Sequence, residues 1–154
     1  MKLVFVLEHY HPYIGGAEKL FTELTRALVN RGYAVTVIDP RGAFATPERF
    51  PEIDLRPEWP DEIWDELDVD RRTAIVALTH DPKIDDPALG RALRSEAFYI
   101  GALGSRKTNA ARHERLVAGG LDADSMARLH APIGLDIGAK GAVEIAISVM
   151  AEVT

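Results

Sequence analysis

The strongest constraint on the fold is an apolar segment at the start of the chain, followed by glycines, a helical pattern and a second apolar segment. Residues 2–7 form an apolar run after the initial Lys2, with two valines and a phenylalanine, which predicts a buried strand. Gly15 and Gly16 follow, and apolar residues then recur at spacings of three and four, as in a helix. Gly32 lies just past the expected end of that helix, and residues 34–38 predict a second strand. Two strands joined by a helix are expected to pair in parallel through a right-handed crossover.

The remainder of the chain continues this alternation. Strands are predicted at residues 53–56, 73–78 and 98–101, and helices at 58–67, 87–95, 105–119, 123–129 and 141–153. The second of these helices is expected to begin near Pro87, because proline is tolerated in a first turn. Five strands alternating with helices predict an α/β protein with a Rossmann-like, doubly wound, mostly parallel sheet in three α/β/α layers. A chain of 154 residues is expected to form a single domain, residues 1–154.

Composition and charge narrow the classes of partner. The formal net charge is −6 and the 18 lysines and arginines are scattered, so we expect no nucleic-acid partner. No apolar run approaches the roughly 18 residues of a membrane span, and the apolar start meets Glu8 too early for a signal peptide. We therefore expect no membrane partner and, with no cysteine in the chain, a cytoplasmic protein. A homodimer stays open, because exposed edges or a poorly covered face would drive dimerisation.

The candidate binding residues follow predicted strands, where open α/β sheets bind their ligands. Gly15 and Gly16 would let backbone N–H groups approach a phosphate at a helix N-terminus, although the G-x-G-x-x-G dinucleotide pattern is absent. The alternative is a flexible turn that leads into the helix. Asp39 ends the second strand and would bind ribose hydroxyls. Its alternative role is a turn in which its side chain bonds its own backbone.

A second strand–glycine–helix junction lies at residues 101–106. Ser105 is predicted to cap the following helix, and Arg106 would favour an anion beside the helix N–H groups. The alternative is a cap and a tight turn without a ligand. We predict at most weak nucleotide or phosphate binding, and the residues predicted to bind are Gly15, Gly16, Asp39, Gly101, Gly104, Ser105 and Arg106.

Three further patterns do not lead us to predict a catalytic residue or a metal site. The pair His80-Asp81 follows a buried strand and has the residue types of an acid–base pair, but neighbouring side chains point in different directions. His9 and His11 supply too few ligands for a metal site. Glu58 and Glu66 are spaced as E-x7-E, but they lie in an acid-rich stretch where such a spacing arises by chance.

The first quarter of the chain resembles the opening of GT-B-fold retaining glycosyltransferases. The resemblance rests on the pattern H-x-x-P-x-x-G-G-A-E at residues 9–18, followed by a helix and by residues 30–38. In that family the two glycines lie near the diphosphate of the sugar-nucleotide donor. This resemblance covers residues 1–38 and implies a glycosyltransferase-related enzyme, whose second, donor-binding domain is not found in the sequence.

The chain from about residue 34 to residue 154 resembles the C-terminal Rossmann-like domain of the xanthine dehydrogenase accessory family (XdhC/CoxI type). The runs that carry this resemblance are residues 39–41, 44–51, 78–89, 99–106, 132–139 and 144–152. That family is associated with molybdenum-cofactor binding, with sulfuration or protection of the cofactor, and with its delivery to molybdenum hydroxylases. The resemblance implies a natural accessory domain that binds the molybdenum cofactor or a nucleotide, with a molybdenum hydroxylase as partner.

The two resemblances meet near residues 35–39, so the leading hypothesis from the sequence is an engineered chimera. In it, a glycosyltransferase-like fragment, residues 1–38, replaces the matching part of an accessory-protein-like domain, residues 39–154. The hypothesis predicts no evolved catalytic activity and no cofactor beyond residual nucleotide or phosphate binding. The natural accessory domain and the glycosyltransferase-related enzyme are the two alternatives.

Overall fold

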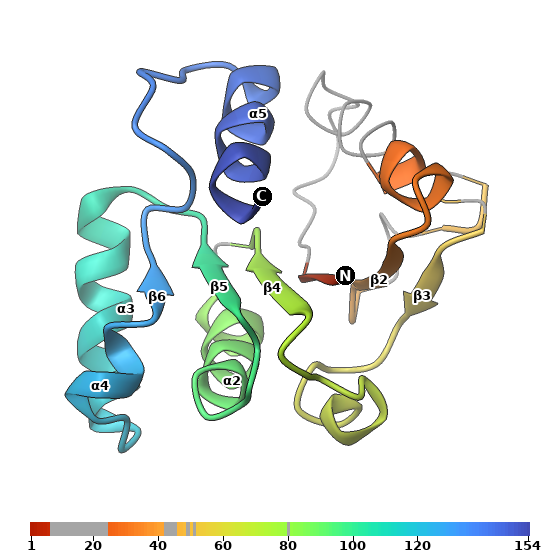
Figure 1. Cartoon of the computed structure of the whole chain (residues 1–154). Coiled ribbons are helices and arrows are strands. Elements are labelled where there is room, and N and C mark those ends of the chain that lie inside the picture. The colour runs from red at the N-terminus through yellow and green to blue at the C-terminus, as the bar shows by residue number, and fades with distance from the viewer. Residues whose placement is uncertain (7–24, 42–45, 49, 51, 80) are drawn as a thin grey trace.

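The apolar, β-branched segments of the chain pair side by side in one sheet. The computed structural model describes residues 1–6, 25–41, 46–48, 50, 52–79 and 81–154. Its six strands are all parallel and lie in the order β3-β2-β1-β4-β5-β6. Their bounds are β1 Lys2–Val6, β2 Ala34–Ile38, β3 Asp54–Arg56, β4 Thr73–Ala77, β5 Tyr99–Ala102 and β6 Leu129–His130 (Figure 1).

The order of the strands reverses direction at β1, which pairs with β2 on one side and with β4 on the other. Val4 of β1 lies opposite Thr36 of β2 and Ile75 of β4. A sheet that is extended first to one side and then to the other is doubly wound. The Rossmann-like α/β fold predicted from the sequence is therefore confirmed, with every strand parallel.

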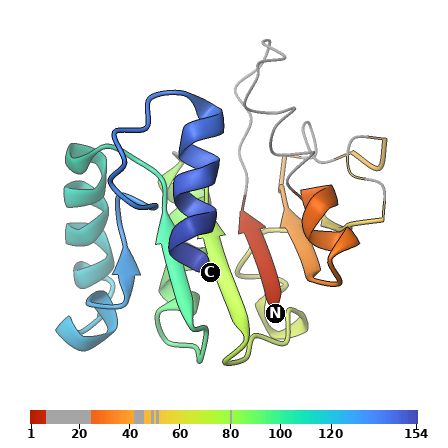
Figure 2. The same ribbon diagram turned by 45° about the horizontal axis from the view of Figure 1, so that its top comes forward.

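Helices cover both faces of the sheet, as Figure 2 shows. Their bounds are α2 Pro82–Ala92, α3 Arg106–Ala118, α4 Ala123–Met126 and α5 Ala142–Val153, with a helical segment at residues 25–30 and a 3-10 turn, η1, at Trp64–Glu66. Successive side chains of a strand point to opposite faces. Val4 and Val6 accordingly belong to the core that includes Leu89 of α2, whereas Phe5 belongs to the core that includes Val149 of α5.

Two helices begin or end differently from the sequence-based prediction. Helix α2 begins at Pro82, five residues before Pro87, because Asp81 caps it by accepting the Lys83 N–H at 2.9 Å. The expected helix at 123–129 stops at Met126 and is followed by strand β6. The turn between them is held by Arg128, which donates to the carbonyl groups of Leu93, Ser95 and Ala97.

The helix predicted at residues 58–67 is absent from that stretch, which contains only η1. The N–H groups of Glu62 and Ile63 both donate to the carbonyl of Trp59, at 3.0 and 3.3 Å, so the chain forms a turn that leads into η1. Four apolar residues suggested the helix, and three of them, Ile63, Trp64 and Leu67, are buried in the core, whereas Trp59 is 37% exposed. These three side chains therefore reach the core from a turn and a short 3-10 helix, without a long α-helix.

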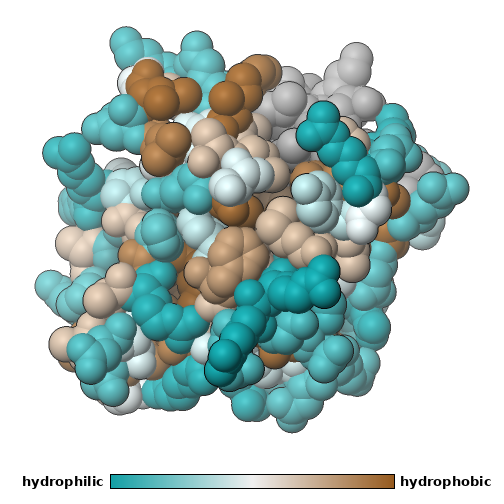
Figure 3. Space-filling model, in the orientation of Figure 1, coloured by the Kyte–Doolittle hydropathy of each residue, from teal (hydrophilic) through white to brown (hydrophobic). Residues whose placement is uncertain are grey.

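The outer surface of α5 and the loop before it carries exposed apolar side chains, which gather in the upper part of Figure 3. The large apolar residues exposed in this stretch are Leu135, Ile137, Val143 and Ile147. Across the part of the chain that the structure describes, no helix has the length and apolar character needed to cross a membrane.

The carboxylate of Glu152 ties α5 to the sheet and to the loop after β6. Its Oε2 accepts the Tyr99 hydroxyl at 2.5 Å and the Gly134 N–H at 2.7 Å, and its Oε1 lies 3.3 Å from Nδ1 of His130. Burial opposes ionisation of Glu152, but the hydrogen bonds from Tyr99, Gly134 and His130 outweigh it and lower the pKa of this carboxyl. Glu152 is therefore ionised in the fold and stabilises it as a charged acceptor.

A Glu152→Gln variant tests this contribution by its pH dependence. The folded pKa lies below the ordinary value of 4.5, so the stabilisation is present above about pH 4.5 and is lost as the pH falls through the folded pKa. We expect the variant to unfold at lower urea than the wild type at pH 6, and the difference to shrink toward pH 3. Glu58→Gln, at an exposed carboxylate, is the control. A difference that stays constant between pH 6 and pH 3 would contradict the assignment.

Candidate functional site

The loops that follow the strands lie at one edge of the sheet, because all the strands run in the same direction. In Figure 2 the strand arrowheads point to this edge, which we call the carboxyl edge. The described residues there include Asp39 after β2, Thr79 after β4 and Ser105 after β5. In doubly wound sheets this edge forms the ligand-binding crevice, at the point where the strand order reverses.

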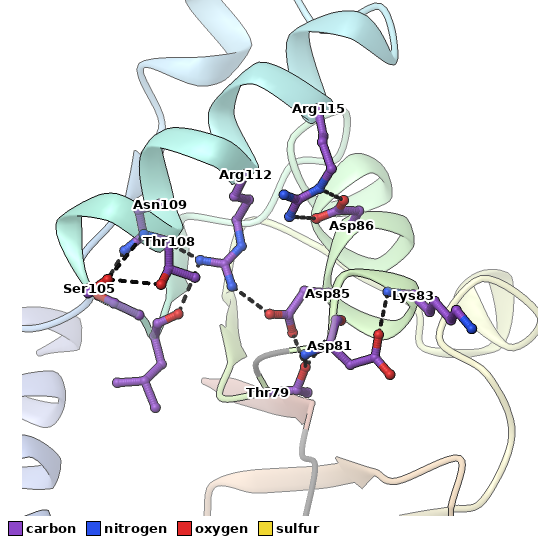
Figure 4. Close-up of polar contacts among 12 residues, drawn as sticks. Thr79, Asp81, Lys83, Asp85, Asp86, Ser105, Thr108, Asn109, Arg112 and Arg115 are labelled. Carbon is purple, nitrogen blue, oxygen red and sulfur yellow. Dashed lines mark hydrogen bonds and ion pairs between the residues drawn. The ribbon is translucent and has the colours of Figure 1, made fainter.

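A buried ion pair between α2 and α3 lies directly below this edge (Figure 4). Nη2 of Arg112 lies 2.6 Å from Oδ2 of Asp85, and the two side chains are only 2% and 1% exposed. Thr79 donates to Oδ1 of Asp85 at 2.7 Å, which connects the end of β4 to the same carboxylate. Burial raises the pKa of the Asp85 carboxyl, while the Thr79 hydrogen bond and the Arg112 charge act against that rise.

The same arginine holds the loop between β5 and α3. Nη1 of Arg112 donates to the carbonyl of Leu103 at 3.1 Å and also contacts Oδ1 of Asn109. Asn109 in turn donates to the carbonyl of Gly104 at 3.0 Å. Among the described residues, Nε of Arg112 is the buried side-chain polar atom that has no hydrogen-bond partner. The conformation of this loop thus depends on a side chain two turns into α3.

Ser105 caps α3, as the sequence predicted. Its hydroxyl accepts the Thr108 N–H at 3.1 Å and lies 2.9 Å from the Thr108 hydroxyl. Gly104 has a φ of +146°, and a Cβ there would lie 3.2 Å from Thr108, so glycine suits this position. Arg106, the first residue of the helix, is exposed at the carboxyl edge. The loop conformation is confirmed, and the binding of a ligand by these residues stays a prediction.

Two of the predicted binding residues, Gly101 and Asp39, have structural roles. A Cβ on Gly101 would lie 2.5 Å from Cδ1 of Ile133, so this glycine makes room for a core side chain. Asp39 is 1% exposed and accepts the N–H of Arg41 at 3.1 Å, which is the turn that the sequence left as an alternative. Gly15 and Gly16 lie outside the described residues.

The predicted residues share one edge without meeting at one point. Asp39 follows β2 and Ser105 follows β5, and both β1 and β4 lie between those strands. Three strand spacings of about 4.8 Å put the two residues roughly 14 Å apart along the edge. One extended ligand, or a ligand at only one end, fits this spacing better than a compact ligand held by every predicted residue.

A second ion pair was not predicted from the sequence. Arg41, in the turn after β2, pairs with Asp81, which precedes α2. The motif Asp81-Pro82 is typical of a helix start, with the acid as cap and proline at the first helical position, and this signal was available in the sequence. His80, its proposed acid–base neighbour, lies outside the described residues.

No group of three or more histidine, aspartate and glutamate side chains in the described ranges is placed to hold a metal ion. Lys107 joins Arg106 on the exposed first turn of α3, where a basic side chain is not favoured by the helix dipole. Cations next to the N–H groups of a helix start suit an anionic ligand.

Comparison with known proteins gives a consistent family match. The model of the family described as "XdhC Rossmann domain" matches residues 13–153. The chain is 34% identical over 131 residues to a probable xanthine dehydrogenase subunit of Bacillus subtilis, covering 84% of this chain and 38% of that protein. It is 36% identical over 85 residues to the molybdenum cofactor insertion chaperone PaoD of Escherichia coli, covering 55% of this chain and 27% of the chaperone.

A solved structure, described as a xanthine dehydrogenase from Bacillus halodurans, has the same fold. It superposes with a TM-score of 0.74 at 27% identity, over 99% of this chain and 41% of that chain. The chain thus spans about two fifths or less of the length of these relatives.

These natural relatives overturn the leading hypothesis from the sequence. The family match begins at residue 13 and continues through residues 35–39, where two fragments were expected to meet. It includes residues 13–38, which the hypothesis had assigned to the glycosyltransferase-like fragment. The interpretation as an engineered chimera without an evolved function is therefore wrong, and the comparisons favour the alternative of a natural accessory domain.

Proposed function

The chain belongs to the XdhC Rossmann domain family, and from that premise we propose that it binds the molybdenum cofactor or a nucleotide as an accessory domain in the maturation of a molybdenum hydroxylase. The names of the relatives support this role, since one is a molybdenum cofactor insertion chaperone and another is part of a probable xanthine dehydrogenase. The proposal treats residues 1–154 as one domain and the molybdenum hydroxylase as its partner. It also places the protein in the cytoplasm.

The observation that carries the proposal is the β5–α3 loop at the carboxyl edge. Arg112 and Asn109 fix the carbonyls of Leu103 and Gly104, so the loop is held in one conformation before any ligand arrives. Preorganisation of this kind reduces the entropy that binding would otherwise cost.

The charges around this loop fit an anionic part of a ligand. Arg106 and Lys107 are exposed on the first turn of α3, next to the N–H groups that begin the helix. A basic side chain there opposes the helix dipole, and a bound anion would compensate both the cations and the dipole. In this proposal the domain binds and orients the cofactor as cargo, and no bond of the cofactor is made or broken.

Charge reversal at Arg106 tests the proposal. Because an acidic residue in a first turn favours the helix, Arg106→Glu should leave the stability of the fold unchanged or slightly raised. Binding of the anion should nevertheless weaken, and we expect the dissociation constant to rise about tenfold through the loss of a charge-assisted contact. The measurement is calorimetric titration of the wild type and the variant with the molybdenum cofactor and with ATP, NAD and UDP.

The matched control is Arg91→Glu, which makes the same charge change at the opposite end of α2, in its last turn. The control should bind within about twofold of the wild type, since a distant exposed charge is largely screened. Absence of binding to the molybdenum cofactor and to all three nucleotides by the wild type would overturn the proposal. Equal weakening in both variants would show a general effect of net charge and would also count against it.

A further inference from the structure

The ion pair between Arg41 and Asp81 crosses the carboxyl end of β1. Arg41 follows β2 and Asp81 follows β4, and β1 pairs with both of those strands. Two strand spacings, about 9–10 Å in all, separate β2 from β4. The pair therefore spans the point at which the strand order reverses, where a doubly wound sheet binds its ligand.

Asp81 is the fixed partner. Its N–H donates to the Thr79 hydroxyl at 3.0 Å, and its Oδ1 accepts the Lys83 N–H at 2.9 Å as the cap of α2. Its other carboxylate oxygen, Oδ2, accepts the hydrogen bond from the Arg41 guanidinium. The carboxylate would thus remain hydrogen-bonded and stabilised by the positive end of α2 if Arg41 left it. Separation of this pair does not leave an uncompensated buried charge, in contrast to the pair of Asp85 and Arg112.

Arg41 is the partner that can change its contact. Its side chain is 42% exposed, whereas that of Asp81 is 18% exposed. The hydrogen bond from its N–H to Asp39 holds its backbone at the edge. Partly exposed ion pairs contribute only about 0–1 kcal/mol. A phosphate offers the same guanidinium two parallel charge-assisted hydrogen bonds.

From these contacts we infer that Arg41 binds an anionic group of the ligand at its own end of the carboxyl edge and leaves Asp81 to do so. In the absence of ligand, Arg41 and Asp81 pair across the end of β1. An arriving phosphate takes the place of the Asp81 oxygen, and the carboxylate keeps its role as the cap of α2. The inference rests on the proposed function, because it assumes an anionic ligand at the carboxyl edge.

Two variants give opposite expected changes, with ATP as the probe. Arg41→Gln removes the cation, and we expect the dissociation constant for ATP to rise about tenfold. Asp81→Ser keeps a helix cap but removes the competing carboxylate, so we expect ATP to bind up to about fivefold more tightly. The control is Arg71→Gln, which breaks an exposed ion pair with Glu96 before β4, at the opposite edge, and should bind ATP as the wild type does.

The outcomes separate this inference from the proposed function. If the wild type binds ATP and both Arg41→Gln and Asp81→Ser bind it equally well, the exchange of partners is wrong and the proposed function stands. If ATP binds only to Asp81→Ser, the exchange is supported, because the wild-type pair then outcompetes the probe. If neither ATP nor the molybdenum cofactor binds to any form, both the inference and the proposed function are overturned. Equal weakening in Arg41→Gln and Arg71→Gln would also overturn the inference.

Discussion

Replacing Arg112 with methionine is expected to lower the free energy of unfolding by about 3–5 kcal/mol. Methionine preserves much of the apolar stem but removes the guanidinium, which leaves the Asp85 carboxylate 1% exposed and without its counter-charge. The carbonyl of Leu103 loses its donor in the same step. Breaking a buried pair by removing one partner is costly, because the remaining charge has neither water nor an opposite charge to stabilise it.

The pH dependence of the Arg112→Met variant identifies the cause. Burial already raises the pKa of Asp85 above its ordinary value of 3.8, and loss of the arginine would raise it further. A folded state that binds this proton more tightly than the unfolded chain loses stability as the pH rises above about 4. The destabilisation should therefore be larger at pH 7 than at pH 4.5, as measured by urea unfolding followed by circular dichroism.

The matched control is Arg115→Met on the same helix. Arg115 pairs with Asp86 at 2.5 Å, but its side chain is 40% exposed, so we expect a loss of at most about 1 kcal/mol. The double variant Arg112→Met with Asp85→Leu should recover part of the loss, because it removes the orphaned charge. Similar losses in Arg112→Met and Arg115→Met would contradict the importance assigned to the buried pair.

A Gly134→Ala change should cost about 2–5 kcal/mol, from two separate causes. The residue has a φ of +92°, a conformation that costs an L-residue roughly 1–2 kcal/mol. A Cβ there would also lie 2.5 Å from the Ser148 hydroxyl and 3.1 Å from the backbone nitrogen of Val149 in α5. Because backbone atoms cannot rotate away, α5 would have to shift, and overpacking of this kind costs about 1–3 kcal/mol.

Gly138→Ala separates the two causes. Gly138 also has a positive φ, +74°, but a Cβ there meets nothing within 4 Å among the described atoms. Its substitution should cost only the conformational part, about 1–2 kcal/mol. The two variants are compared by their midpoints of thermal unfolding, and equal midpoints would show that the close approach of Gly134 to α5 is not important for stability.

The fold class could be predicted because its signal is local. The strands at 2–7, 34–38 and 73–78 each carry a run of apolar residues, and the structure places strands within all three ranges. Elements with weak local signals were missed or misplaced. Strand β6 has only two residues, and its position depends on the contacts of Arg128 with distant carbonyls.

The candidate site was only partly predictable, because its ion pairs join distant parts of the chain. Asp85 and Arg112 are 27 residues apart, and each lies in a helix where a charged residue ordinarily faces solvent. Arg41 and Asp81 are 40 residues apart in the sequence. They meet because the strands that precede them, β2 and β4, both pair with β1 and so end at the same edge of the sheet. The cap at Ser105, by contrast, follows from residues that are neighbours in the sequence.

The most direct test of the proposed function is to locate ligand binding by NMR. The full chain, labelled with 15N, is titrated with the molybdenum cofactor while its amide resonances are followed. The largest saturable shifts are predicted at the carboxyl edge, for Arg41, Gly104, Ser105 and Arg106. Shifts that are confined to the opposite edge, around Lys2 and Asp68, or the absence of any saturable shift, would contradict the proposal that this domain binds the cofactor at the carboxyl edge.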